Sequence, residues 1–297
     1  MKRIYTVIVA ALLSMFAAGT AEAQDWGRLL QAGAKTVQSM TISDAQVQGY
    51  VRQYINNLDA KSQVAPADNP YTIRLNRIVK GVTQVDGIPL NFKVYITQDV
   101  NAFACADGSV RVYSGLMDLM NDQEVLGVIG HEVGHVANKD TKNAFKEALR
   151  TSALRDVLGS AGGTIGMLSD SQLGAIGEAL LSKSYSRKQE TKADTYGYNF
   201  LKARGINPMY MATAFKKLGS ISGGSSNALM QAFSDHPDTN KRIRNIEKMG
   251  KKDGYKYPTA TATKTTGKKT TVKKLNNGSS ANVESLKSAK KSTKYGK

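Results

Sequence analysis

Cysteine, histidine and aromatic residues are scarce in this sequence. Cys105 is the only cysteine among 297 residues, which excludes an internal disulfide. Stability must therefore come from a hydrophobic core and from any bound metal, and we expect Cys105 to be a small buried apolar residue. Only three histidines occur in the chain. A site built from imidazoles must use most of them.

Long hydrophobic runs are absent beyond the N-terminus. Lys2 and Arg3 precede an apolar stretch over residues 4–18, and Ala21-Glu22-Ala23 supplies a small-x-small cleavage pattern. The apolar stretch is shorter than the roughly 20 residues of a membrane span, which favours a signal peptide over residues 1–23 rather than a membrane anchor. We expect an exported mature chain without a transmembrane span, free in the periplasm, peripheral to the outer membrane, or secreted.

Acidic residues are scarce in the C-terminal tail, residues 251–297. This tail holds 13 lysines and 2 acidic residues, or 13 − 2 = +11 of the net charge of +17, which leaves +6 for the rest of the chain. Lys, Thr, Ser, Asn and Gly dominate it, and such a composition cannot bury enough apolar surface to fold. We expect a disordered basic tail that contacts an anionic envelope surface. Nucleic acid is an unlikely partner, because few aromatic residues are present for base stacking.

Hydrophobic periodicity predicts two helical regions. Residues 24–66 repeat apolar residues at helical spacing and predict an N-terminal helical segment. Residues 116–250 are almost wholly helical in pattern, and Asn121 with Glu124 is typical of a capping box at a helix start. A glycine-rich stretch over residues 159–177 interrupts this region, and we expect a loop or a loosely ordered segment there.

Alternating apolar and polar residues predict strands between the two helical regions. The alternation begins at Tyr71, Ile73 and Leu75 and continues to residue 115. Residues 101–113 are typical of a hairpin that turns at an Asp-Gly pair. The segment therefore predicts a small antiparallel sheet inside a domain over residues 67–250.

The segment His131-Glu132-Val133-Gly134-His135 carries the strongest chemical signal. Residues four apart lie on one face of a helix, so the two imidazoles can share one tetrahedral metal ion. The adjacent Glu132 can reach a metal-bound water and take its proton. The surrounding apolar stripe argues against a solvated helix face. The pattern therefore predicts two ligands and a general base within five residues.

A third ligand is expected because a catalytic zinc ion takes three protein ligands and leaves one position for water. Glu190 and Asp194 are again four residues apart on a predicted helix. Glu190 can bind the metal, and Asp194 can orient a ligating histidine through its outer ring nitrogen. Two alternatives remain open for these residues. Glu190 can form a salt bridge on a basic helix, and His236 can itself be the third ligand.

Four motifs follow one another in the chain: the Asn101-Ala102-Phe103-Ala104 segment with its hairpin, His-Glu-x-x-His, Ser-Arg-x-x-Glu-x-x-Ala-Asp from Ser186, and His236-Pro237 followed by Arg242. In this order they resemble the zinc metallopeptidase family that includes HtpX and the CAAX prenyl protease, and most of all its soluble periplasmic branch of LoiP/BepA-like peptidases. The resemblance covers roughly residues 71–248 and implies an α+β, mainly α, zincin-like domain whose small sheet packs beside the HExxH helix.

The resemblance implies one zinc ion per chain, and a role for each site residue. His131, His135 and Glu190 would be the ligands and Glu132 the catalytic base. It places His236 and Arg242 close to the site, in contact with the reacting atoms or with an occluding loop. The segment Asn101, Ala102, Phe103 and Ala104 would be the edge strand along which the substrate lies. Two departures stand out: Cys105-Ala106-Asp107 replaces the usual Leu-Pro-Gly, and the membrane spans of HtpX are missing.

The expected function is a zinc-dependent metalloendopeptidase of envelope protein quality control. Addition of a substrate strand to a sheet edge needs an extended chain, so unfolded or misassembled envelope proteins are the expected substrates. The main rival is a zinc-containing holdase or assembly factor with little peptidase activity. A holdase needs metal ligands but no base, so Glu132 argues against it. A second alternative hypothesis is that the basic tail carries the main function of the protein.

Overall fold

The computed structural model describes residues 42–151, 167–181, 184–221, 236 and 239–259. The predicted signal peptide, residues 24–41 of the predicted helical segment and the tail beyond residue 259 lie outside this range. The elements are, in chain order, α3 (Asp44–Lys61), α4 (Pro70–Ile78), β1 (Gln84–Val85), β2 (Ile88–Pro89), β3 (Asn91–Tyr95), β4 (Ala102–Ala104), β5 (Ser109–Tyr113), α5 (Ser114–Leu119), α6 (Asp122–Ala137), α7 (Asp140–Thr151), α9 (Asp170–Leu181), α10 (Arg187–Lys202), α11 (Met209–Ile221) and α13 (Thr239–Lys252).

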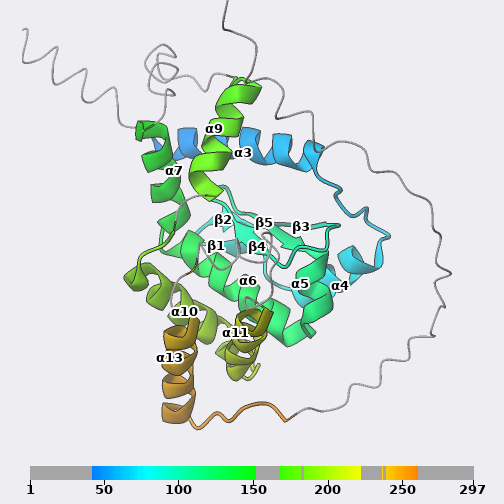
Figure 1. Cartoon of the computed structure of the whole chain (residues 1–297), viewed down its shortest axis with the longest axis vertical. Helices are drawn as coiled ribbons and strands as arrows, with labels where there is room; N and C mark the ends of the chain where they lie inside the picture. The colour runs from blue at the N-terminus through cyan, green and yellow to red at the C-terminus, as the bar shows by residue number, and fades with distance from the viewer. Residues whose placement is uncertain (1–41, 152–166, 182–183, 222–235, 237–238, 260–297) are drawn as a thin grey trace, which may run out of the picture. The chain divides into compact units, whose positions relative to one another are not determined.

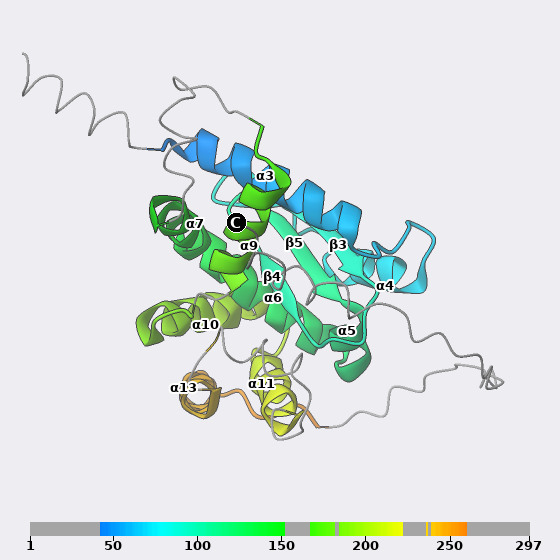
Figure 2. The same cartoon turned by 45° about the horizontal axis from the view of Figure 1, so that its top comes forward.

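A three-stranded sheet in the order β3-β5-β4 lies between α3 and α6 (Figures 1 and 2). Strands β4 and β5 form the predicted antiparallel hairpin, which confirms that expectation. Strand β3 runs parallel to β5, so the sheet is mixed rather than wholly antiparallel. A second hairpin pairs β1 with β2 and turns through Asp86 and Gly87, both at positive φ.

The two faces of the sheet carry different residues because side chains alternate along a strand. Val94, Val110 and Val112 face the α6 side and are each fully buried. Lys93 and Arg111 alternate with them on the α3 side. The aliphatic face closes the main core, whereas the opposite face holds a buried charge.

Two separate apolar clusters result. The large core joins the aliphatic sheet face to α4, α5, α6, α10, α11 and α13. The small core lies where α3 packs against α7 and α9. The buried residues of the small core are Val47, Tyr50, Val51, Ile55, Ala106, Phe145, Leu168, Leu173 and Ile176.

One predicted strand is wrong, because residues 70–78 form helix α4. The Asn69 side chain accepts a hydrogen bond from the Tyr71 amide, and Pro70 occupies the first turn, where a missing N–H costs nothing. Leu75 is buried while Ile73 remains 56% exposed. The alternation of apolar residues over residues 71–75 therefore does not mark one face of a sheet. The capping residues Asn69 and Pro70 determine that this segment is helical.

The loop expected over residues 159–177 is wrong for residues 170–177, since α9 begins at Asp170, whereas residues 167–169 lie outside any helix or strand. Ser169 and Gln172 exchange hydrogen bonds as in a capping box. Gly177 suits the helix because a Cβ there would lie 2.9 Å from the Tyr54 ring on α3. Residues 159–166 lie outside the described range.

The start of the basic tail is also ordered. Helix α13 continues to Lys252, and Asp253 accepts hydrogen bonds from Tyr198 and Lys202 at 3.1 and 2.7 Å. Tyr257 donates a hydrogen bond to Glu247. Those contacts extend the folded part past residue 251. Within the described residues, no helix has the length and apolarity that a membrane crossing requires.

Candidate metal and catalytic site

Helix α6 carries the first two candidate ligands and the candidate base. Asn121 and Glu124 form the predicted capping box at its start, with hydrogen bonds of 3.0 and 2.9 Å. The i, i+4 spacing puts His131 and His135 on one face, where their Nε2 atoms lie 3.2 Å apart. Both imidazoles are almost completely buried. The helix therefore presents two nitrogen atoms to one point, as the sequence predicts.

Helix α10 brings Glu190 to that point. Its Oε1 lies 3.5 Å from His135 Nε2, and its Oε2 lies 3.6 Å from His131 Nε2. The two helices approach closely where they cross. A Cβ on Gly134 would lie 3.0 Å from the Ala193 carbonyl oxygen, which is tighter than ordinary van der Waals contact.

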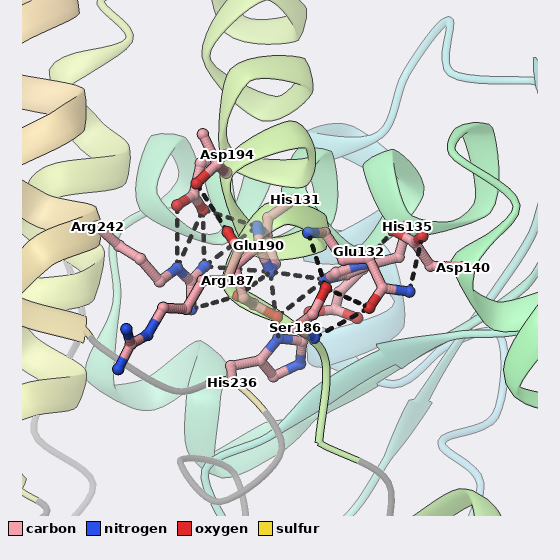
Figure 3. A network of polar contacts seen from close by, with 12 residues as sticks. His131, Glu132, His135, Asp140, Ser186, Arg187, Glu190, Asp194, His236 and Arg242 are labelled. Carbon is pink, nitrogen blue, oxygen red and sulfur yellow. Dashed lines mark hydrogen bonds and ion pairs between the residues drawn. The ribbon is translucent and has the colours of Figure 1, made fainter. Parts of the chain in front are cut away.

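His236 completes the group. Its Nδ1 lies 3.3 Å from His131 Nε2 and 2.9 Å from Glu190 Oε1. One ligand atom from each of His131, His135, Glu190 and His236 falls within 4.8 Å of all the others. Figure 3 shows these side chains converging from α6, from α10 and from the segment before α13.

The residues fit a zinc ion by distance and by chemistry. Ligands about 2.0–2.1 Å from a tetrahedral zinc ion lie about 3.3–3.4 Å from one another. The distances among His131, His135 and Glu190, at 3.2, 3.5 and 3.6 Å, match that spacing, whereas His236 Nδ1 lies closer to Glu190, at 2.9 Å. Glu190 Oε2 is buried without a hydrogen bond, although the Arg242 guanidinium lies 2.9 Å away. Burial, together with Arg242, lowers the pKa of His131 and favours the neutral imidazole that binds metal.

Asp194 and Arg242 contact the candidate ligand side chains. Asp194 Oδ1 lies 2.9 Å from His131 Nδ1, so the other ring nitrogen faces the metal position. Arg242 donates to both Asp194 oxygens and pairs with Glu190 at 2.9 Å. Its side chain is almost fully buried among these carboxylates. Arg242 therefore lies directly beside the candidate ligands.

Asp140 is a site residue that the sequence reasoning missed. Its Oδ2 lies 3.0 Å from His135 Nδ1, and its Oδ1 accepts a hydrogen bond from Gln189. Burial lowers the pKa of His135, but Asp140 and Glu190 outweigh it and raise that pKa to about 9. The surroundings thus favour a positive charge at this point. The available signal in the sequence was an acidic residue five positions after His135. In the structure, Lys139 at φ 64° turns the chain into α7 at this point.

Glu132 faces the cleft between the ligands and β4. Burial raises the pKa of its carboxyl group, an effect that His236 and His135 oppose. The His236 ring stands 3.7 Å from Glu132 Oε1. Tyr185, which the sequence reasoning did not select, stacks on the His135 ring with centroids 4.0 Å apart. The base is thus enclosed by rings and sheltered from bulk water.

Strand β4 forms one edge of the sheet beside this cleft. Asn101 and Cys105 make their main-chain hydrogen bonds to β5, so by alternation Ala102 and Ala104 direct their main-chain groups to the free edge. The Asn101 side chain accepts from the Ala102 amide at 2.8 Å. Despite the unusual residues at its tip, the hairpin closes normally, with the Gly108 amide bonded to the Cys105 carbonyl.

Comparisons with known proteins agree with this geometry. The sequence model of peptidase family M48 matches residues 71–250. Metalloprotease LoiP of Escherichia coli is 44% identical over 78% of this chain and 91% of its own length. Metalloprotease YcaL of the same organism is 39% identical over 75% of this chain and 87% of its own. A protease HtpX homolog of Desulfatibacillum aliphaticivorans is 30% identical over 65% and 74%, respectively. The chain therefore belongs to peptidase family M48 and is a zinc-dependent hydrolase of peptide bonds.

Proposed function

We propose that this protein is an endopeptidase in which His131, His135 and Glu190 hold one zinc ion and Glu132 is the general base. The observation that carries the proposal is the convergence of those ligand atoms within 4.8 Å, with a buried glutamate beside them. A bound zinc ion acts as a Lewis acid and lowers the pKa of water to about 7. The chain's own residues supply the remaining steps.

Glu132 takes the proton of the attacking water and passes it to the leaving amine. Its raised pKa suits both steps, because the group must accept and then release one proton. The substrate lies along β4 and pairs with the main-chain groups of Ala104 and with the Ala102 carbonyl at the free edge, because the Ala102 amide is already bonded to the Asn101 side chain. Asn101 and Phe103 keep that edge in place through their pairing with β5.

His236 and Arg242 have different roles in this proposal. The His236 nitrogen lies at a fourth ligand position, which a catalytic zinc ion leaves for water. We assign His236 to contact with the reacting atoms once its ring moves off that position. Arg242 is a positioning residue, because its guanidinium touches Asp194 and Glu190 and stays buried behind them.

The substrates that we propose are unfolded or misassembled envelope proteins, cleaved in the periplasm as part of protein quality control. The support is chemical: strand addition requires an extended chain, and the N-terminal sequence is typical of an exported protein. The lysine-rich tail adds attraction to anionic envelope surfaces. A holdase that keeps the zinc ion but cleaves little is the alternative.

The deciding experiment compares the purified mature chain with Glu132→Gln. We expect both to hold about one zinc ion per chain and the variant to cleave unfolded casein about 10²–10⁴-fold more slowly. Equal metal content without cleavage by either protein would favour the holdase. Equal rates on folded and unfolded substrates would contradict the proposed substrate class.

A shortened chain tests the tail separately. Truncation after Thr259 preserves the Asp253–Lys202 and Tyr257–Glu247 contacts. We expect this variant to keep its peptidase activity and to lose affinity for anionic vesicles. Loss of cleavage on truncation would give the tail a direct part in catalysis.

A further inference from the structure

Helix α13 carries its basic residues on its exposed side. Five exposed positions hold lysine or arginine, and we call them the basic stripe: Lys241, Arg244, Lys248, Lys251 and Lys252. At about 100° of rotation per residue, they fall within an arc of about 100° on the helix surface. The stripe is about 17 Å long, because a helix rises about 1.5 Å per residue. The opposite side of α13 carries Ile243 and Ile246, which are buried in the large core.

The acidic residues nearest to the basic stripe are already paired with lysines of other helices. Glu247 is the only acidic residue of α13, and it pairs with Lys216 of α11 at 3.1 Å. Asp253 follows the helix and pairs with Lys202 of α10 at 2.7 Å. No stripe residue forms an ion pair with another residue that the structure describes. The stripe therefore keeps its positive charge available for a partner outside the folded domain.

Helix α10, which packs beside α13, exposes charge of the same sign. Figures 1 and 2 show the two helices next to each other, away from α3. The acidic residues of α10 are Glu190 and Asp194, and both are buried at the candidate metal site. Its exposed residues include Lys188 and Lys192, one helical turn apart. Helix α10 thus adds positive rather than negative charge to this part of the surface.

We propose that the basic stripe docks the folded domain on a lipid bilayer that contains anionic phospholipid. This goes beyond the attraction assigned to the tail, because it gives the folded domain a contact surface of its own and an orientation on the membrane. Residues 260–297 continue the basic character with ten lysines and one acidic residue. The two contributions add, so truncation after Thr259 removes the share of the tail and leaves that of the stripe.

The residue types and the shape of the stripe favour a bilayer. Four of its five residues are lysines, whose flexible stems carry a compact point charge that suits the diffuse negative charge of lipid headgroups. A site for a single phosphate or carboxylate favours the planar fork of arginine instead. The stripe runs along the outer surface of a helix, and none of its residues lines a pocket beside Glu132. An extended anionic surface therefore fits it better than a small ligand.

A nucleic acid fits less well, because the aromatic rings next to the stripe are already engaged. Tyr255 packs against the large core, with its ring centroid 6.4 Å from that of Tyr198. The Lys216 ammonium lies 4.0 Å from the centroid of the Tyr257 ring, and the Tyr257 hydroxyl donates a hydrogen bond to Glu247. Binding of single strands usually relies on rings that are free to stack on bases.

Docking through the stripe leaves the cleft accessible to a substrate. The buried side of α13 supplies Arg242 to the candidate ligands, whereas the stripe faces away from them. The pocket beside Glu132 is lined by residues of α3, α7 and β4 and by none of α13. The free edge of β4 therefore stays open while α13 rests on the membrane.

The test measures binding of the full mature chain to vesicles of phosphatidylcholine with and without phosphatidylglycerol. One variant combines Lys241→Gln, Arg244→Gln and Lys248→Gln. We expect its affinity for the anionic vesicles to fall about tenfold to a hundredfold, because each basic residue near such a surface contributes about a factor of five. The vesicles without phosphatidylglycerol should bind neither protein appreciably.

A matched control removes the same number of charges from exposed positions away from α13. It combines Arg52→Gln, Lys61→Gln and Lys80→Gln. Its affinity should change by less than about threefold, because charges beyond the Debye length of about 8–10 Å from the membrane are screened. Equal losses in the two variants would assign the binding to net charge and overturn the proposal. No loss in either would assign it to the tail alone and overturn it as well.

Two further measurements complete the test. The α13 variant should keep its zinc content and its cleavage of casein in the absence of vesicles, because the stripe contacts neither the ligands nor β4. If that variant does not fold, Lys248→Gln alone should still lower the vesicle affinity about fivefold. If the α13 variant loses affinity for a single-stranded oligonucleotide but not for anionic vesicles, the stripe binds nucleic acid and the proposal is wrong.

Discussion

The metal site and the pocket beside it are built in different ways. The candidate ligands come from short motifs on α6 and α10, two helices that pack closely within the large core. The pocket wall comes from α3 and α7, which meet over the small core, and from the β4 hairpin. The candidate metal site thus depends on helical spacing, whereas the shape of the pocket depends on the docking of a separate helix. Variants that destabilise one region should leave the properties of the other region measurable.

The largest effect on stability is expected from Asp59→Asn. The substitution leaves Arg111, only 1% exposed, without its carboxylate partner. Breaking a buried ion pair in this way costs about 3 kcal/mol, at the low end of the usual range because Asp59 is partly exposed. Urea unfolding measures the loss. Asp68→Asn, at an exposed position, should change the unfolding free energy by less than about 0.5 kcal/mol, and equal effects would contradict the assignment.

Asp140→Ala should show how far the two regions are coupled, because Asp140 begins α7 yet contacts a ligand on α6. Without it, His135 loses the acceptor that orients its ring. Zinc affinity should fall about 10–100-fold, the usual cost of losing such a partner. Competition with a chromogenic chelator gives the dissociation constant. An unchanged constant would limit Asp140 to a structural role.

Two glycine substitutions compare the packing of the regions directly. Gly134→Ala places a methyl group 3.0 Å from the α10 backbone and should destabilise the protein by about 1–3 kcal/mol. Gly174→Ala on α9 meets nothing within 4 Å and should stabilise it by about 0.5–1 kcal/mol. Thermal unfolding of both variants measures the two changes in stability. Changes of the same sign would contradict the prediction.

Much of the metal site follows from the sequence because its parts are local. The i, i+4 spacing within α6 places His131, His135 and Glu132, and capping residues mark where α6 and α10 begin. That Glu190 and His236 reach the same point depends on tertiary packing, and the family resemblance supplied it. Asp140 and Tyr185 were missed because their roles depend on chain direction and ring stacking.

The fold was predictable where local signals agreed. The prediction failed where these signals competed. The β4–β5 hairpin follows from its alternation and Asp-Gly turn. Residues 71–78 carry the same alternation but are preceded by Asn69-Pro70, and helix capping prevails. The parallel pairing of β3 joins segments far apart in sequence, and no local pattern specifies it.

The last expected effect concerns the acid stability of the link between α3 and the sheet. Hydrogen bonds from Arg111, Lys93 and Tyr95 outweigh the opposing effect of burial and lower the pKa of Asp59 to about 2. A carboxyl group whose pKa falls on folding stabilises the protein above its unfolded pKa of about 4. That contribution is lost as pH falls from about 4 through 2. At pH 2 only about half of the Asp59 carboxylates are protonated, so the loss is smaller than in Asp59→Asn. We expect the urea midpoint to fall less between pH 4 and pH 2 in that variant than in the unaltered chain. Parallel pH profiles would place the acid sensitivity elsewhere and weaken the case that a charged contact holds α3 at the pocket.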